Sequence, residues 1–383
     1  MDFNLTEEQQ LFRDSVSKFA RTELAPKAAE RAQAPGYPWD VAARMAELGL
    51  MGIPLPEADG GMGGSLVDSL IAIQTVAEAC PRSGDVIQAG NFGPVRTFAE
   101  YATADQKKRF LTPILEGRAV ISLGMTEPQA GSAVTELKTA AVADGDDYII
   151  NGTKIFGTHS SEANVFLVYV RFGPGLDGIG SVLIERGMPG FTVGQPTGFM
   201  NGEDWSQLYF DNVRVPATNV VLGTGGFRKQ MAGFNVERLG NAARAVAVGR
   251  HAFNLARDHA KDRRQFGRNL CEFQGLQWKF AELELKLSAA QLLLMRAAVN
   301  AGDGLPDPHE TALAKLACNE AGFFAANESL QIMGGTGFSN DSTAQYCLRR
   351  TRGWMIAGGS VEILKNRIAE GIFDRRFPQH AQR

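Results

Sequence analysis

The sequence has few cysteines and few histidines for its length. Four cysteines in 383 residues stand far apart with no CxxC pair, and the five histidines form no HExxH or HxH pattern. Disulfide frameworks and structural zinc sites need such clusters, so neither is expected and no metal ligands are assigned. The chain is long enough to bury a large core without covalent cross-links.

Long apolar runs and a surplus of one charge are also missing. No stretch reaches the ~18 apolar residues that span a bilayer. The first residues, MDFNLTEEQQLF, lack the basic start and apolar core of a signal peptide. With 39 basic and 42 acidic side chains, nothing points to nucleic acid or an anionic membrane, although a local basic patch is compatible with this total. We expect a cytoplasmic protein.

Hydrophobic periodicity divides the sequence into three regions. Residues 1–120 show helical spacing, with Thr6 as the first N-cap. Residues 121–225 contain short β-branched and aromatic runs between turn signals, and residues 226–383 are helical again. We predict an α+β multidomain fold: an N-terminal helical domain, a middle antiparallel β-barrel or sandwich, and a C-terminal four-helix bundle. The first expected helix begins after Thr6. The others cover residues 40–50, 66–80, 105–116, 234–262, 271–300, 306–333 and 360–373.

Two segments carry hydroxyl and aromatic groups near turns. Segment 124–137, GMTEPQAGSAVTEL, places Thr126 and Ser132 around a turn that contains Gly131. Small residues let backbone N–H groups approach a ligand, although an ordinary interdomain loop has the same composition. Segment 151–164, NGTKIFGTHSSEAN, offers an aromatic ring and a hydroxyl to a planar ligand, or is a β-hairpin with Asn-Gly as its turn.

Four segments in the last third carry charge or glycine at the ends of predicted helices. Segment 262–277 is rich in arginine, which suits phosphate binding or a solvated loop. Segment 331–341 is a glycine-rich helix end, and too poor a match to GxGxxG for a Rossmann fingerprint. Before the last helix, Ser360 serves either as an N-cap or beside a bound anion. A Glu-Arg pair at 237–238 is ordinarily a surface feature.

In this order and spacing, the motifs resemble those of acyl-CoA dehydrogenases over nearly the whole chain. GMTEPQAGS is followed by NGTKIF, then RRQFGR with FQ, then QIMGGTGF, and finally GGSVEI-KN-IAEGIF. The resemblance implies bound FAD, an acyl-CoA substrate, an electron-transferring flavoprotein as acceptor, and a homotetramer. It assigns cofactor contacts to Met125, Thr126, Gly131, Ser132, Phe156, Thr158, Ser360 and Glu362, and contacts with a neighbouring subunit's FAD to Arg263, Phe266, Gln274, Gln331 and Gly335.

The sequence departs from the family's pattern at the catalytic position. Most members carry the base as Glu in a Tyr-Glu-Gly-Thr run, where this chain has Ala357-Gly358-Gly359-Ser360. An isovaleryl-CoA and long-chain-like branch instead places a Glu directly before the CoA-binding Arg, where this chain has Glu237. The resemblance therefore implies that Glu237 removes the α-proton, that flavin N5 accepts the β-hydride, and that the N–H of Gly358 helps to bind the thioester oxygen. A smaller departure is Ala133, where the family has Asp.

The implied substrate contacts leave the acyl group open. Arg238 and Asn235 correspond to CoA contacts, as does Ser132, and the segment with Asp85 and Gln88 corresponds to the acyl pocket. These polar residues favour a short, branched, cyclic or polar acyl group over a straight fatty chain, unless they face solvent or cap the helix. The alternatives to dehydrogenation to the 2-enoyl-CoA are an enoyl-CoA reductase, a non-redox desulfinase-like member and a non-catalytic partner subunit. A carrier-protein thioester is an alternative to CoA.

Overall fold

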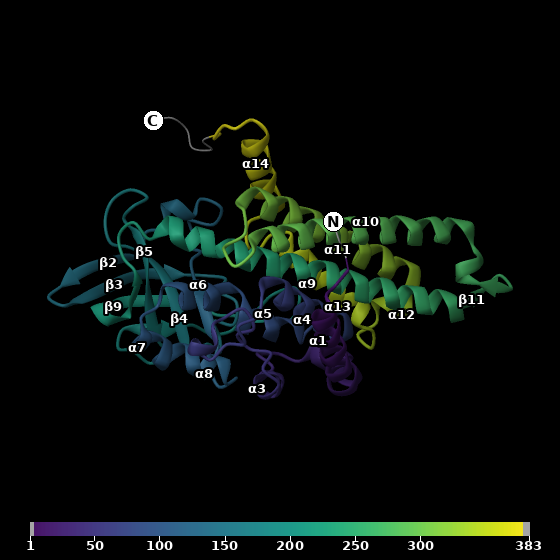
Figure 1. The fold of residues 1–383 in the computed structure, drawn as a ribbon, viewed down its shortest axis with the longest axis horizontal. Coiled ribbons are helices and arrows are strands. Elements are labelled where there is room, and N and C mark those ends of the chain that lie inside the picture. The colour runs from purple at the N-terminus through teal and green to yellow at the C-terminus, as the bar shows by residue number, and fades with distance from the viewer. Residues whose placement is uncertain (1–3, 378–383) are drawn as a thin grey trace. The chain divides into compact units, whose positions relative to one another are not determined.

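The computed structural model describes residues 4–377, which fold into two compact units. Unit 1 combines Met1–Ala32, Ile73–Gly84 and Arg238–Arg383, and unit 2 combines Gln33–Ala72 and Asp85–Glu237. Helices α4 (Leu66–Ala79) and α9 (Phe227–Asp262) each cross a boundary between the units. Figure 1 gives the labels of the elements.

Unit 2 is built on one eight-stranded sheet, in the order β10-β5-β4-β2-β3-β9-β6 with β1 paired to β4. β4 and β5 are apolar and buried along nearly their whole length, whereas β9 alternates buried and exposed side chains, as a strand with one covered face does. Figure 1 shows β2, β3 and β9 side by side. The strands are β1 (Ile121–Gly124), β2 (Ala140–Asp144), β3 (Asp147–Lys154), β4 (Val165–Arg171), β5 (Ile179–Glu185), β6 (Phe191–Val193), β9 (Leu208–Pro216) and β10 (Val220–Leu222).

The sheet confirms a middle β domain and corrects two details of the prediction. Most neighbouring strands are antiparallel, but β1 and β2 each pair with β4 in parallel. Among the described residues the strand order ends at β10 and β6 without closing, so the sheet is sandwich-like and not a barrel. Parallel neighbours need long connections, which alternation within one strand does not reveal.

A further correction concerns Asn151-Gly152, which lies inside β3 and is not a hairpin turn. The turn between β2 and β3 falls earlier, where Asp144 pairs with Asp147 across Gly145 with φ +63. At Gly152 the pairing with β9 shifts in register, and a Cβ there would lie 2.4 Å from Thr139 Oγ1. Glycine is needed at position 152 because the chain there lies too close to Thr139 for a side chain.

The sequence analysis did not predict two helices that lie between the expected helices 66–80 and 105–116. α5 (Gly84–Asn91) and α6 (Gly93–Tyr101) precede the sheet, and α6 approaches the start of α9 closely. A Cβ at Gly233 would lie 2.6 Å from Thr97 Oγ1. The expected helix at 105–116 forms as α7 (Ala104–Gln106), a π-helical turn and α8 (Thr112–Leu115).

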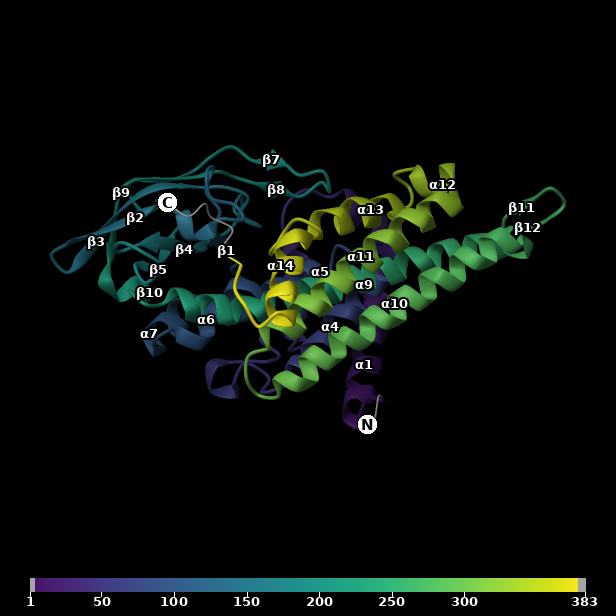
Figure 2. The ribbon, with the colours of Figure 1, turned by 90° about the horizontal axis from the view of Figure 1, so that it is seen from above.

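Unit 1 is a helical bundle, as predicted. α1 (Glu7–Phe19) begins with a capping box in which Thr6 Oγ1 accepts from the backbone of Gln9, which confirms the expected cap. α10 (Gln274–Ala301) and α11 (Pro308–Met333) run side by side (Figure 2), and α14 (Val361–Ile372) also packs on α11. A close contact joins the part of α9 in this unit to α11, where a Cβ at Gly322 would lie 2.1 Å from the carbonyl oxygen of Ala245.

The sequence analysis missed the short helices α2 (Ala28–Gln33) and α12 (Gly335–Phe338) and the longer helix α13. α13 (Thr343–Trp354) is short and carries three arginines, so it has few apolar residues that would mark a helix in the sequence. It nevertheless buries Tyr346, Cys347 and Trp354. In addition, α9 begins at Phe227 instead of 234, since polar residues at its start hide the helical pattern. Within residues 4–377, none of the helices has the length and apolar character needed to cross a membrane.

Candidate active site

Unit 2 holds the carboxylate of Glu237 between two neighbouring helices. Gln88 Nε2, on α5, donates to Glu237 Oε2 at 2.6 Å. On α6, Gly93 has φ +59, and a Cβ at this position would lie 2.7 Å from the same oxygen. Only glycine combines this backbone conformation with such a close approach. Glu237 is therefore half-buried in a fixed position and is not an ordinary surface carboxylate.

In unit 1, Arg238 contacts the loop that carries Gly358. Arg238 Nε donates to the carbonyl oxygen of Gly358 at 3.2 Å. Burial, helped by the charge of Arg367, lowers the pKa of Arg238 to about 10, so the guanidinium is still charged at neutral pH. A partly desolvated cation beside an exposed loop is suited to bind a polar or anionic group.

A buried lysine forms hydrogen bonds with the backbone around Gly358. Lys315 is fully buried in α11, and its ammonium donates to the carbonyl oxygens of Trp354, Ala357 and Gly359 at 3.3, 2.9 and 3.0 Å. Gly358 itself has φ +70, and a Cβ would lie 3.0 Å from Asn241 Nδ2. A side chain, and thus a glutamate, is strained in this conformation.

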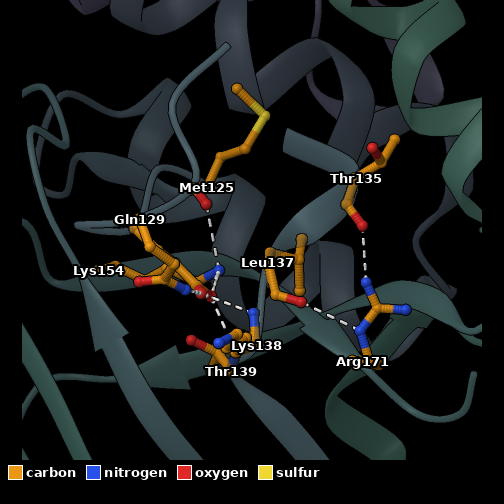
Figure 3. Close-up of polar contacts among 9 residues, drawn as sticks. Met125, Gln129, Thr135, Leu137, Lys138, Thr139, Lys154 and Arg171 are labelled. Carbon is orange, nitrogen blue, oxygen red and sulfur yellow. Dashed lines mark hydrogen bonds and ion pairs between the residues drawn. The ribbon is translucent and has the colours of Figure 1, made fainter. Parts of the chain in front are cut away.

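A buried ion pair fixes the loop between β1 and β2 (Figure 3). Glu127 accepts from Lys154 Nζ at 2.7 Å, from the backbone N–H of Thr139 at 2.9 Å and Lys138 at 2.6 Å, and from Gln129 Nε2 at 2.6 Å. Burial alone would raise the pKa of Glu127, but the charge and hydrogen bonds of Lys154 lower it to about 2. Burial lowers the pKa of Lys154 to about 8 against the opposing effect of Glu127.

The same network reaches the residues that the sequence predicts beside a cofactor. Lys154 Nζ also donates to the carbonyl oxygen of Met125 at 3.1 Å. The backbone N–H of Ile155 donates to the carbonyl oxygen of Thr126 at 2.9 Å. Gly131 and Ser132 lie exposed further along the loop. Glu127 and Lys154 were missed by the sequence analysis, although both lie within the quoted motifs. Lys154 is the last residue of β3, whose sequence DYIINGTK is largely polar, so no local pattern revealed that its side chain is buried.

An exposed aromatic cluster surrounds Phe156. Its ring is 53% exposed, its φ is +59, and its centroid lies 4.5 Å from that of Trp205 and 6.1 Å from that of Phe199. Thr158 is also exposed and accepts through its carbonyl oxygen from Ser122 Oγ. Exposed aromatic faces held in a strained backbone are suited to cover a planar ring. Trp205 was not predicted, since it lies far along the chain.

The remaining predicted cofactor residues lie at helix ends of unit 1. Phe266 is 94% exposed in a short hairpin, next to Arg263 and before Gln274 at the start of α10. Gln331 and Gly335 are exposed at the end of α11, where Gly334 has φ +58 and forms the helix cap. The glycine-rich helix end predicted for segment 331–341 is therefore confirmed, with Gly334 as the cap of α11.

The last helix begins as the cap interpretation predicts. Ser360 Oγ accepts from the backbone N–H of Ile363 at 3.5 Å. The pKa of Glu362 is lowered by hydrogen bonds from the backbone N–H of Glu362 and from the side chain of Ser360. Of the predicted substrate contacts, Asp85 and Asn235 are both buried in unit 2. No group of three or more His, Cys, Asp or Glu side chains that could hold a metal is found in residues 4–377.

Unit 2 presents the carboxylate of Glu237, paired with Gln88, and an aromatic cluster around Phe156. Unit 1 presents the partly buried guanidinium of Arg238. This donor set fits a planar redox cofactor and a thioester substrate. Family models for the acyl-CoA dehydrogenase N-terminal, middle and C-terminal domains match residues 6–118, 122–213 and 224–373. The chain belongs to the acyl-CoA dehydrogenase family. It is an oxidoreductase of the class whose cofactor is FAD.

Relatives of similar length support this assignment. The chain is 34% identical to a short-chain specific acyl-CoA dehydrogenase of Clostridium acetobutylicum, over 97% of this chain and 100% of the relative. It is 33% identical to an acryloyl-CoA reductase (NADH) of Anaerotignum propionicum, over 98% and 97%. Its fold matches that of butyryl-CoA dehydrogenase from Megasphaera elsdenii with a TM-score of 0.91 and 30% identity, over 97% and 100% of the two chains.

Proposed function

We propose that this protein dehydrogenates an acyl-CoA thioester to the 2-enoyl-CoA, with Glu237 as the base. The observation that carries the proposal is the carboxylate of Glu237, held by Gln88 and by the bare backbone of Gly93. The usual base position is Gly358, whose positive φ disfavours any side chain. The carboxylate of Glu237 supplies the base that Gly358 cannot provide.

In this proposal each residue acts on a defined part of the thioester. Glu237 takes the proton from the α-carbon, and the N–H of Gly358 donates to the thioester oxygen as negative charge develops there. FAD, when bound, supplies the acceptor for the hydride of the β-carbon. Arg238 binds the CoA portion, together with Asn235 and Ser132.

The proposed cofactor contacts follow the positions described above. Met125, Thr126, Gly131 and Ser132 offer a loop whose backbone is fixed by the ion pair beneath it, and Phe156 with Thr158 offers an aromatic face and a hydroxyl. Ser360 and Glu362 offer the start of a helix. The contacts proposed for a second subunit's FAD are Arg263, Phe266, Gln274, Gln331 and Gly335, of which Phe266 is the most exposed.

The proposal extends to assembly and electron transfer. A homotetramer is proposed from the resemblance of the motifs, and the exposed side chain of Phe266 at a hairpin tip is available for contact with a second subunit. An electron-transferring flavoprotein is proposed as the acceptor, by the resemblance of the motifs. We also propose domain boundaries near 120 and 225, which the family models at 6–118, 122–213 and 224–373 support.

The decisive variant is Glu237→Gln, which keeps the shape of the side chain and removes its basicity. We expect it to retain FAD and to lose turnover by a factor of ~10² to 10⁴, because a positioned base contributes about that much. The measurement is the bleaching of the flavin spectrum by saturated acyl-CoA esters without oxygen. Full activity of the variant would exclude Glu237 as the base.

One relative favours a second direction of the same chemistry, since the reductase from Anaerotignum propionicum is as similar as the dehydrogenases. The same spectrum separates the two. If chemically reduced enzyme is reoxidised by an enoyl-CoA, while no saturated ester bleaches the oxidised form, the protein is a reductase. If the purified protein contains no flavin, the catalytic proposal fails.

A further inference from the structure

Gln88 is oriented by the carboxylate that it contacts. Its side chain is buried on α5, and Nε2 donates to Glu237 Oε2 at 2.6 Å and lies 3.5 Å from the backbone carbonyl oxygen of Glu237. Both partners are acceptors, so the amide must present its NH₂ group to them. Its carbonyl oxygen, Oε1, therefore points away from Glu237.

This carbonyl oxygen is buried and has no hydrogen-bond partner. Since the two polar atoms of an amide are ~2.3 Å apart, Oε1 lies no more than about 5 Å from the carboxylate oxygen. Asn91, one turn further along α5, provides a contrast. It accepts from the N–H of Ile53 at 2.6 Å and donates to the carbonyl oxygens of Leu50 and Ile87, both at 2.9 Å. Native proteins rarely leave a buried acceptor unpaired without a reason.

A second buried amide lies on the same face as Glu237. Gln230 is seven residues earlier in α9, which places it within ~20° of the same helix face and ~10 Å along the axis. It is fully buried, and neither its oxygen nor its nitrogen has a hydrogen-bond partner. The side of α9 that carries the base therefore presents an unpaired donor and acceptor two turns away.

We propose that Gln88 positions the base Glu237 and selects an acyl group that carries a hydrogen-bond donor, a hydroxyl or an N–H, within a few bonds of the α-carbon. The donor pairs with Gln88 Oε1, and Gln230 offers a further polar partner to the distal part of the acyl group. The inference rests on the proposed function, since it requires Glu237 to act on the α-carbon. A plain alkyl chain would leave these buried amides unpaired.

The test compares matched pairs of substrates on the holoenzyme. Each pair consists of an ω-hydroxyacyl-CoA and the alkyl ester in which a methyl group replaces the hydroxyl, for example 4-hydroxybutyryl-CoA and pentanoyl-CoA, up to eight carbons. A site built to pair with a hydroxyl rejects the analogue that lacks it, so at the best chain length we expect kcat/KM to favour the hydroxy ester by roughly 10- to 100-fold.

Two variants separate positioning from a general structural effect. Gln88→Met keeps the length of the side chain and removes both polar atoms. It should abolish the preference for the hydroxy ester and move the acid limb of the kcat profile to higher pH, because the carboxylate loses its donor. The control is Gln74→Met, which breaks the pair between Gln74 and Gln291 at 2.6 Å and should change neither readout.

The outcomes distinguish this inference from the function on which it rests. If the wild-type enzyme uses alkyl and hydroxy esters equally well at every length, the inference is wrong and the dehydrogenase proposal stands. If no ester of either kind bleaches the flavin, or if Glu237→Gln is fully active, the proposed function fails and takes the inference with it. The wild-type comparison decides the matter even if Gln88→Met does not fold.

Discussion

The ion pair between Glu127 and Lys154 offers a quantitative test of the fold around the proposed cofactor loop. Both side chains are almost completely buried, and the pair is 2.7 Å apart. The charge and hydrogen bonds of Lys154 lower the pKa of Glu127, whereas burial lowers the pKa of Lys154. Burial therefore opposes both charges and their attraction offsets it, so that replacing such a pair as a whole by uncharged residues often costs little stability.

Removing one member has a different effect from removing both. Glu127→Gln leaves a buried ammonium without its counter-charge, and we expect it to lower the free energy of unfolding by ~3 to 5 kcal/mol. Glu127→Gln combined with Lys154→Met should recover most of that loss, because no charge remains buried. The assay is urea unfolding of the holoprotein, with flavin content measured in parallel, since the loop carries Met125 and Thr126.

The pH dependence has a defined sign. Because the pKa of Glu127 is lower in the folded state, its contribution is complete above pH 4.5 and is lost as the pH falls toward 2. Glu127→Gln should flatten this part of the stability curve. The surface ion pair between Arg214 and Asp147 on the same sheet is the control, and Arg214→Gln should leave the unfolding midpoint unchanged. A single variant as stable as the wild type, or a double variant less stable than the single, would refute the reasoning.

Four further predictions concern the active site and the helix packing. Arg238→Ala should raise KM for acyl-CoA about tenfold or more while kcat stays nearly constant, as the loss of a charge-assisted contact implies; steady-state kinetics check this. Gly358→Ala should cost ~1 to 2 kcal/mol of stability through its positive φ and should lower kcat, measured by thermal unfolding and flavin bleaching. Gly322→Ala, whose Cβ would lie 2.1 Å from the carbonyl oxygen of Ala245, should destabilise by ~1 to 3 kcal/mol. Gly353→Ala, with open space around its Cβ, should be neutral or stabilising by up to ~1 kcal/mol in the same melts.

Elements with strong periodicity or clear caps could be predicted locally. α1 follows from its apolar spacing and its cap at Thr6, and the long helices α10 and α11 follow from long stretches of residues that favour helix. α13 could not be found in this way. Its buried face includes Arg350 and polar residues, and its Trp354 packs against another helix of the bundle, where Arg244 of α9 lies 4.9 Å from the centre of the ring.

The site shows the same division between local motif and distant partner. The motifs contain Thr126, Phe156 and Glu237, and their order along the chain was enough to place the protein in its family. The partners that fix these residues are remote in sequence. Gln88 lies 149 residues before Glu237, and Trp205 lies well beyond Phe156, so no local pattern links either pair.

The sequence by itself determined the family, the order of helical and β regions, and the shift of the candidate base from position 358 to 237, because each of these depends on residue identity and spacing alone. Only the tertiary structure decided which strands pair in parallel, that Gly93 and Gln88 enclose the carboxylate, and that Gln88 keeps a buried oxygen unpaired. The physical reason is that burial and hydrogen-bond pairing depend on segments far apart in the chain, which become neighbours only when the core closes.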